Sequence, residues 1–185
     1  AALPPAARDG AHTAFTAHSI PMAMAERSNY EIQLRTACEL TAREAGIANW
    51  KLVFQSRSGP PHQPWLEPDI GDHIRTLHEQ GVPGLVIQPI GFISDHMEVL
   101  YDLDHEAKDL CDELGMPMAR AATPGVHPRF VQMVVELMRE RMDPSLPKRA
   151  LGDRGPNHDV CPPNCCQSGR EAMMAAGGGR PAARP

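Results

Sequence analysis

The sequence lacks both the long apolar runs of a membrane protein and the basic excess of a nucleic-acid-binding protein. No apolar stretch approaches the roughly 18 residues that a membrane-spanning helix needs, so no transmembrane segment is predicted. Lys and Arg number 18 against 23 Asp and Glu, a formal net charge of −5 that leaves no surplus of positive charge for binding phosphates. Apolar residues still make up 42% of the 185 residues, which predicts a folded chain with one core of ordinary size.

The chain also lacks an initiating Met, a secretory signal and an Arg-rich transit pattern, so we expect a fragment or a processed chain. Its five cysteines are odd in number and partly clustered, unlike a secreted disulfide framework, which predicts a reducing, cytoplasmic setting. Three segments are expected: residues 1–10 as the end of a preceding segment, 11–143 as a folded domain, and 144–185 as a flexible tail rich in Pro, Gly and Ala.

Strand-like and helix-like segments alternate four times along the folded domain, with connections of a few residues. The expected strands are residues 13–19, 51–55, 84–90 and 116–122, and the expected helices are 30–45, 69–80, 95–114 and 128–142. Such alternation predicts a Rossmann-like, three-layer α/β domain in which helices flank a four-stranded parallel sheet. The near-continuous apolar strand at 84–90 predicts burial on both of its faces.

Two ionisable sites fall where an α/β protein binds its ligands, at the carboxyl ends of strands. His18 ends the first strand, and Glu98 follows the third strand across a loop that contains Gly91. We expect the two side chains to face one crevice, where an imidazole opposite a carboxylate binds a transition metal or accepts protons. Plainer interpretations stay open: His18 bonded to loop backbone, and Asp95 as a helix cap with Glu98 as its capping-box partner.

Three carboxylates continue along the helix that begins near Asp95. Glu98, Asp102 and Glu106 are four residues apart in each step, which places them on one helical face. No Lys or Arg stands three or four residues from Glu98 or Asp102, so like charges repel along this edge. The row is either a solvated acidic face or a series of hard oxygen ligands for a divalent cation.

A Pro-rich loop follows the second strand and carries Arg57 and Trp65. The Trp65 indole either stacks on a planar ligand or covers the core. Two cysteines, Cys38 and Cys111, sit singly beside apolar neighbours on expected helices and are predicted to pack as small buried side chains.

The tail contains the remaining thiols, at Cys161, Cys165 and Cys166. Three thiols so close together on a featureless segment indicate a metal site, either zinc or iron–sulfur. Because four ligands are usual, the fourth is left open between His158, Cys38 and a residue outside this chain. The alternative is a set of free or oxidised tail thiols.

Three blocks are specific enough to carry a family resemblance. They are residues 15–21 (FTAHSIP), residues 55–60 (QSRSGP) with 64–66 (PWL), and residues 89–102 (PIGFISDHMEVLYD). In this order they closely resemble the ferrochelatases, which insert ferrous iron into a porphyrin. The resemblance runs from about residue 11 to 143 and covers the second half of that family's two-domain chain, so a chelatase-like fold is implied.

The resemblance implies roles for the acidic and basic side chains. The residues matching His18 and Glu98 face each other across the porphyrin cleft, the histidine binding the metal or taking pyrrole protons and the glutamate acting as its partner. Asp102 and Glu106 match carboxylates proposed as a metal route, on a helix that is locally widened in the family.

The same resemblance extends to substrate and partner. Arg57, Trp65 and His96 lie in the matching blocks and are candidate substrate-binding residues. The family's amino-terminal domain, with much of the porphyrin-contacting wall, is absent here, so little or no activity is expected from this chain alone. That amino-terminal domain is therefore expected as a partner that completes the porphyrin site. The oligomeric state is left open.

The tail resembles that of actinobacterial ferrochelatases, in which three carboxy-terminal cysteines and one from the first half bind a [2Fe–2S] cluster. Cys161, Cys165 and Cys166 would supply three ligands and the missing half the fourth. Members of this bacterial type use coproporphyrin III, so Fe-coproporphyrin is the implied product. Protoporphyrin IX or cobalt chelatase activity, or a non-catalytic metal- or tetrapyrrole-binding fragment, are the alternatives.

Overall fold

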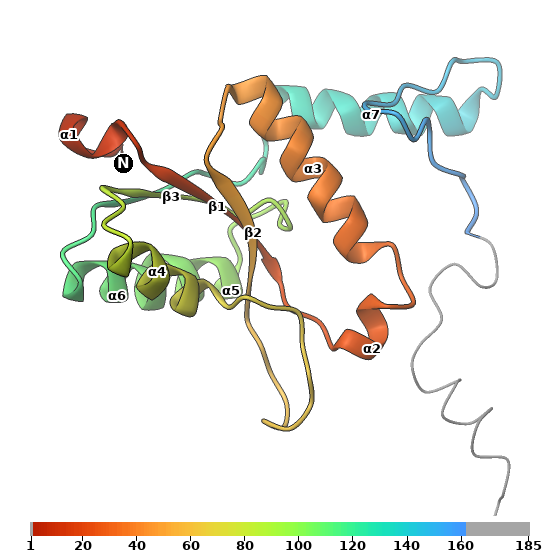
Figure 1. Cartoon of the computed structure of the whole chain (residues 1–185). Coiled ribbons are helices and arrows are strands. Elements are labelled where there is room, and N and C mark those ends of the chain that lie inside the picture. The colour runs from red at the N-terminus through yellow and green to blue at the C-terminus, as the bar shows by residue number, and fades with distance from the viewer. Residues whose placement is uncertain (1, 162–185) are drawn as a thin grey trace, which may run out of the picture.

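A computed structural model describes residues 2–161, and its centre is a four-stranded sheet (Figure 1). The strands are β1 (His12–His18), β2 (Trp50–Gln55), β3 (Leu85–Gln88) and β4 (Met118–Arg120). They lie in the order β2-β1-β3-β4, and each neighbouring pair is parallel. The predicted parallel sheet is confirmed, and all four carboxyl ends meet at one edge.

Helices cover both faces of the sheet, as the three-layer prediction requires (Figure 1). One face packs against α3 (Tyr30–Ala45), with the short α2 (Met22–Ala25) beside it, around a core that includes Phe15, Phe54 and Cys38. The opposite face packs against α4 (Ile70–Glu79) and a composite helix through Ile87, Ile74 and Leu103. This composite helix consists of α5 (Met97–Val99), the π-helix η1 (Leu100–Ala107) and α6 (Lys108–Glu113).

Local sequence explains where several elements begin and end. Asp69 caps α4, its carboxylate accepting a 2.8 Å hydrogen bond from the amide of Gly71. Gly46 ends α3 in a left-handed conformation, with φ of 67°, that other residues rarely adopt. Before the sheet, α1 (Pro5–Arg8) presses Ala7 and Leu3 against the backbone of Gly84, a short helix that the sequence patterns missed.

Strand β3 is less enclosed than its apolar sequence predicts. Leu85 and Ile87 are buried, but Val86 and Gln88, which point to the other face, are only half-buried. Val86 lines an open cavity of about 330 Å³, because α3 covers β1 and β2 on this face rather than β3. The expectation of burial on both faces is therefore wrong for this strand.

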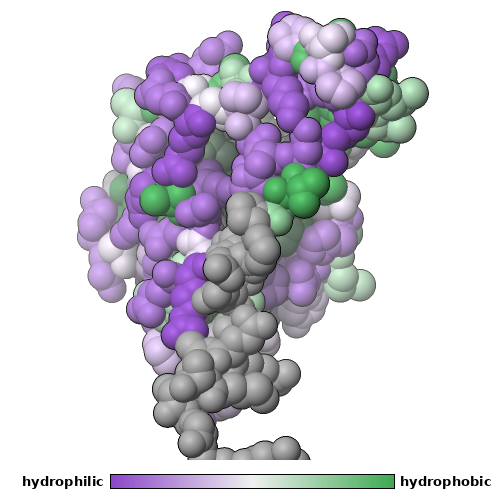
Figure 2. All heavy atoms as spheres, turned by 90° about the vertical axis from the view of Figure 1, so that its right-hand side faces the viewer, coloured by the Kyte–Doolittle hydropathy of each residue, from purple (hydrophilic) through white to green (hydrophobic). Residues whose placement is uncertain are grey.

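Helix α7 (Pro128–Met142) has the predicted bounds but does not pack on the sheet. None of its residues is buried, and the apolar side chains Val134, Leu137 and Met138 are 41%, 49% and 60% exposed. Residues 144–161 contain no helix or strand and return along α7, where Arg141 pairs with Asp159 at 3.1 Å. Figure 2 views the molecule from the side on which α7 lies, where apolar patches interrupt a hydrophilic surface.

No helix within residues 2–161 combines the length and the apolar character needed to cross a bilayer.

Candidate functional site

The carboxyl edge of the sheet brings His18 and Glu98 together across 80 residues of sequence. His18 is the last residue of β1, Glu98 lies in α5, and His18 Nε2 is 3.7 Å from Glu98 Oε1. Their side chains are 34% and 51% exposed, so the pair is open to a ligand from solvent. The two side chains therefore lie close together, as expected for residues at the carboxyl ends of neighbouring strands.

Gly91 makes this approach possible. Its amide donates a 3.1 Å hydrogen bond to the carbonyl of Thr16, so the loop that follows β3 lies directly on β1. A Cβ atom at residue 91 would be only 2.7 Å from Cβ of Ala17, the neighbour of His18. Only glycine fits this contact without displacing the loop, and the loop in turn sets the start of the helix that carries Glu98.

The other ring nitrogen of His18 is held by the backbone. His18 Nδ1 hydrogen-bonds the carbonyl of Ser19, and the hydroxyl of Tyr30 donates to the carbonyl of His18 at 2.9 Å. Because a carbonyl oxygen only accepts, Nδ1 carries the proton of the neutral ring and Nε2 keeps its lone pair on the side of Glu98. The backbone-bonded and ligand-binding interpretations of His18 are thus compatible, since a fixed tautomer orients the free nitrogen.

The alternative in which Asp95 and Glu98 form a capping box is wrong. The residue that caps α5 is His96, and it makes no side-chain capping bond. Asp95 instead pairs with Arg120, with 3.0 Å between its Oδ1 and the Nη1 of the guanidinium. A cation at the end of β4 has therefore drawn Asp95 away from the helix amides, which leaves Glu98 free of that role.

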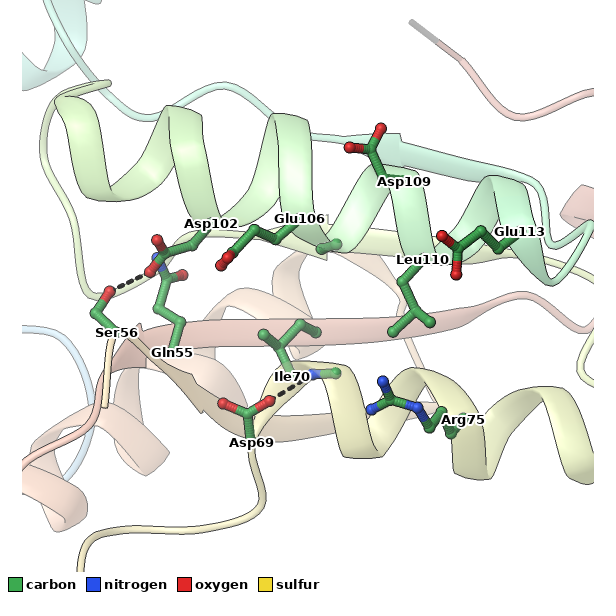
Figure 3. Close-up of a pocket in the computed structure, with 12 residues that line it drawn as sticks. Gln55, Ser56, Asp69, Ile70, Arg75, Asp102, Glu106, Asp109, Leu110 and Glu113 are labelled. Atoms are coloured by element: carbon green, nitrogen blue, oxygen red, sulfur yellow. Dashed lines mark hydrogen bonds between the residues drawn. The ribbon is translucent and has the colours of Figure 1, made fainter. Parts of the chain in front are cut away.

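The acidic row lies on a widened helix, as the family resemblance implied. Asp102 and Glu106 belong to the π-helix η1, and both line a cavity of about 330 Å³ (Figure 3). Asp102 is held by Ser56, whose hydroxyl donates to it, and by Gln55, whose amide nitrogen is 3.3 Å away. Asp102 is thus anchored from the carboxyl end of β2, whereas Glu98 and Glu106 are exposed to solvent.

Further carboxylates that sequence reasoning missed surround the same cavity, namely Asp69, Asp109 and Glu113, with Arg75 as the basic residue of the lining. Asp109 and Glu113 continue the row by steps of three and four residues, a signal that the sequence did contain. Asp69 caps α4, and its place at the cavity could be found only from the packing of that helix. The cavity has a strong excess of negative charge, which attracts cations.

Within residues 2–161, no three His, Cys, Asp or Glu side chains converge tightly enough to hold one metal ion. The pair of His18 and Glu98 therefore offers two protein ligands at most. Water or another molecule would complete the coordination of an ion bound by this pair.

The remaining candidates are Arg57, Trp65 and His96. Arg57 donates to the carbonyls of Pro61 and Gln63, at 3.1 and 3.2 Å, and so closes its own loop. Trp65 is half-buried, and its indole nitrogen is enclosed without a hydrogen-bond partner. His96 is exposed, with its ring edge-on to Phe92. No hydrogen bond between described residues joins these side chains to His18 or Glu98.

The cysteines divide as predicted into buried and tail residues. Cys38 and Cys111 are fully buried, and burial raises the pKa of their thiols to about 12 and about 11. Cys38 is enclosed between α3 and the sheet, so its thiol has no access to solvent. Cys161 is exposed, whereas Cys165 and Cys166 lie outside the described residues.

A parallel sheet that carries an imidazole, a carboxylate and an acidic cavity at its carboxyl edge is typical of α/β proteins that bind a metal ion. Comparison with known proteins narrows this class. The family profile of the ferrochelatases matches residues 2–142, and the chain belongs to the ferrochelatase family.

Curated relatives support the same assignment. A ferrochelatase of Rhodopirellula baltica is 55% identical over 165 residues, which cover 89% of this chain and 47% of that protein. A coproporphyrin III ferrochelatase of Streptomyces griseus is 46% identical over 198 residues, covering 97% of this chain and 53% of the relative. The chain thus spans about half the length of the curated relatives it matches.

A solved structure from Marinobacter aquaeolei, described as a cobalamin (vitamin B12) biosynthesis CbiX protein, shares the fold. It matches with a TM-score of 0.53 at 18% identity, covering 73% of this chain and 99% of that one. At this identity the likeness concerns the fold alone.

Proposed function

We propose that this chain is the carboxy-terminal half of an enzyme that inserts ferrous iron into coproporphyrin III in haem biosynthesis. The observation that carries the proposal is the distance of 3.7 Å between His18 Nε2 and Glu98 Oε1 at an open edge of the sheet. The names of relatives such as the one from Streptomyces griseus favour coproporphyrin III over protoporphyrin IX.

The residue types suit the chemistry of metal insertion. Placing a divalent ion in a porphyrin displaces two pyrrole N–H protons, so the ring must meet both a metal donor and a proton acceptor. The lone pair of His18 Nε2 and the carboxylate of Glu98 divide these tasks. A ring that bends as it binds between them exposes a nitrogen lone pair to the incoming ion.

The acidic cavity supplies the metal in this proposal. Asp102 and Glu106 lie on the same helix as Glu98, and their negative charge raises the local concentration of divalent cations. Since no three such ligands converge among residues 2–161, an ion would cross the cavity with water still bound and would not be trapped before it reaches His18.

The other wall of the porphyrin site is assigned to an amino-terminal half. The chain spans about half of its curated relatives, and the apolar side chains of α7 remain exposed. A helix of 15 residues is rarely stable in water without a covered apolar face. We expect the chain alone to insert iron slowly or not at all. Its thiols favour a reducing, cytoplasmic setting for the enzyme.

We also propose that Cys161, Cys165 and Cys166 contribute three ligands to a [2Fe–2S] cluster. The exposure of Cys161 fits this assignment, because a thiol must be accessible and deprotonated to bind iron. The burial of Cys38 points to a fourth ligand outside this domain. A visible charge-transfer absorption that is lost in Cys165→Ser supports the cluster, and a colourless protein with bound zinc contradicts it.

Cobalt(II) titration of the chain tests the central proposal. The titration uses a background of Cys161→Ser, Cys165→Ser and Cys166→Ser so that tail thiols do not bind the ion. His18→Ala and Glu98→Gln should each weaken cobalt binding by at least tenfold, since each removes one of two protein ligands. His78→Ala, an exposed histidine on α4, is the matched control.

Activity supplies the second arm. When the chain is extended by an amino-terminal ferrochelatase half, it should insert iron into coproporphyrin III faster than into protoporphyrin IX, and His18→Ala should abolish the reaction. Insertion at the parent rate in His18→Ala would overturn the assignment. Binding of metal and porphyrin without insertion would instead favour a non-catalytic role.

A further inference from the structure

The guanidinium of Arg120 joins three elements near the proposed metal pair. Arg120 ends β4 and is only 14% exposed. Its Nε and Nη2 donate to the two carboxylate oxygens of Asp104, at 2.5 and 2.8 Å, and its Nη1 donates to Asp95 at 3.0 Å. A planar fork of this kind fixes both the distance and the orientation of a carboxylate.

The two aspartates lie on either side of Glu98 in the sequence. Asp95 precedes α5, and Asp104 lies within the π-helix that follows Glu98. One cation at the end of β4 therefore ties both ends of the segment that carries Glu98 to the sheet. From the opposite side, the fully buried amide of Gln55 donates to the carbonyl of Glu98 at 3.1 Å.

The widened helix makes such anchoring necessary. A π-helix is less stable than an α-helix and needs tertiary contacts to persist. If η1 relaxed to α-helical spacing, the residues before it would rotate relative to those after it, and the carboxylate of Glu98 would leave His18. The pair of bonds to Asp104 acts within the widened segment itself.

We propose that Arg120 is a positioning residue that holds Glu98 opposite His18 by clamping Asp95 and Asp104. The inference rests on the proposed function, since it concerns the same metal pair. It predicts the direction in which metal affinity changes when Arg120 is replaced. A positive charge that acted only through the field would repel a divalent cation, so its removal would tighten metal binding. Loss of a clamp weakens binding instead.

Cobalt(II) titration in the triple-serine background separates these effects. Arg120→Met removes both the charge and the fork, and Arg120→Lys keeps the charge but not the bidentate geometry. Both variants should weaken cobalt binding about tenfold, the lower end of what residues that orient metal ligands contribute. Arg35→Met, which breaks the exposed pair with Glu31 on α3, is the matched control and should bind as the parent does.

A double-mutant cycle tests whether Arg120 affects cobalt affinity through Glu98. In a Glu98→Gln background, Arg120→Lys should change cobalt affinity less than about twofold, because there is no carboxylate left to position. A general loss of packing would weaken binding equally in both backgrounds. Circular dichroism checks that each variant is folded, and Asp104→Asn replaces the arginine variants if they do not fold.

Unchanged or tighter cobalt binding in Arg120→Met and Arg120→Lys overturns the positioning role while leaving the metal pair intact. A tenfold loss that persists in Glu98→Gln also overturns it. If His18→Ala and Glu98→Gln themselves bind cobalt as the parent does, the proposed function fails, and the inference fails with it.

Discussion

Acidification should destabilise this fold through a buried pair of imidazoles at the opposite end of β1 from His18. His12 opens β1, His73 lies in α4, and their Nε2 atoms are 3.1 Å apart. His12 Nδ1 is 2.9 Å from the side-chain oxygen of Asn49, which only accepts, so His12 must donate there. Its Nε2 is then the acceptor for the Nε2 proton of His73, a chain of bonds that needs both rings neutral.

The magnitude follows from the position of His73. Burial lowers its pKa from 6.5 to about 4, with the nearby His12 and Lys51 acting in the same direction, and burial also lowers the pKa of His12. Between these pH values the unfolded chain binds more protons than the folded chain, so stability is complete above pH 6.5 and is lost as the pH falls. For His73 alone the full loss approaches about 3 kcal/mol, of which about 1.5 kcal/mol is reached at pH 5.5.

Urea unfolding followed by circular dichroism measures this loss. Between pH 7.5 and 5.5, where most carboxylates stay ionised, the midpoint should fall by roughly 0.7 M at an m-value of about 2 kcal/mol per M. His73→Gln keeps an N–H toward His12 but does not titrate, so its midpoint should depend much less on pH. The matched control is His78→Gln, an exposed residue of the same helix. An equal fall in the parent and in His73→Gln would refute the reasoning.

Other predictions concern the core and the loop before Glu98. Gly91→Ala should cost about 2 kcal/mol of stability and weaken cobalt binding, because the new Cβ overlaps Ala17 and lifts the loop from β1; urea unfolding and cobalt titration check both. Leu103→Ala, at a fully buried site under the sheet, should cost about 3 kcal/mol in urea unfolding. Cys38 and Cys111 should resist alkylation at pH 8 until the chain is unfolded, as mass spectrometry of alkylated protein would show, and rapid labelling of either in the native protein would contradict their burial.

Much of the architecture was predictable because the strands and the longer helices have local sequence signals, which the short helices α1 and α2 lack. Helices 30–45 and 128–142 match their predicted bounds, and the alternation of strands and helices was enough to give a parallel sheet. The packing of α7 was not predictable in the same way. Its apolar side chains lie on one face, as in a helix that packs against a core. The sequence periodicity predicts such a face but does not show which surface it packs against.

Part of the site was likewise predictable from the sequence, and part was not. Sequence order placed His18 and Glu98 at strand ends, and a parallel sheet brings such ends to one edge, so their meeting follows from topology. The competing capping-box interpretation rested on a spacing of three residues between Asp95 and Glu98, which is a local signal. It failed because Asp95 accepts a hydrogen bond from Arg120, 25 residues further on, and does not cap the helix.

The contacts that fix the geometry of the site are nearly all of this long-range kind. Gln55 reaches the carbonyl of Glu98 across 43 residues, and Gly91 meets Ala17 across a strand pairing. The spacing of four residues between the carboxylates also does not reveal a π-helix, although the π-helix affects which carboxylates line the same cavity. Each of these contacts holds a loop or helix onto a strand end, so the edge of the sheet fixes the position of Glu98 relative to His18. The proposed metal pair depends on these anchors, so substitutions that touch neither His18 nor Glu98 should still change the affinity for the ion.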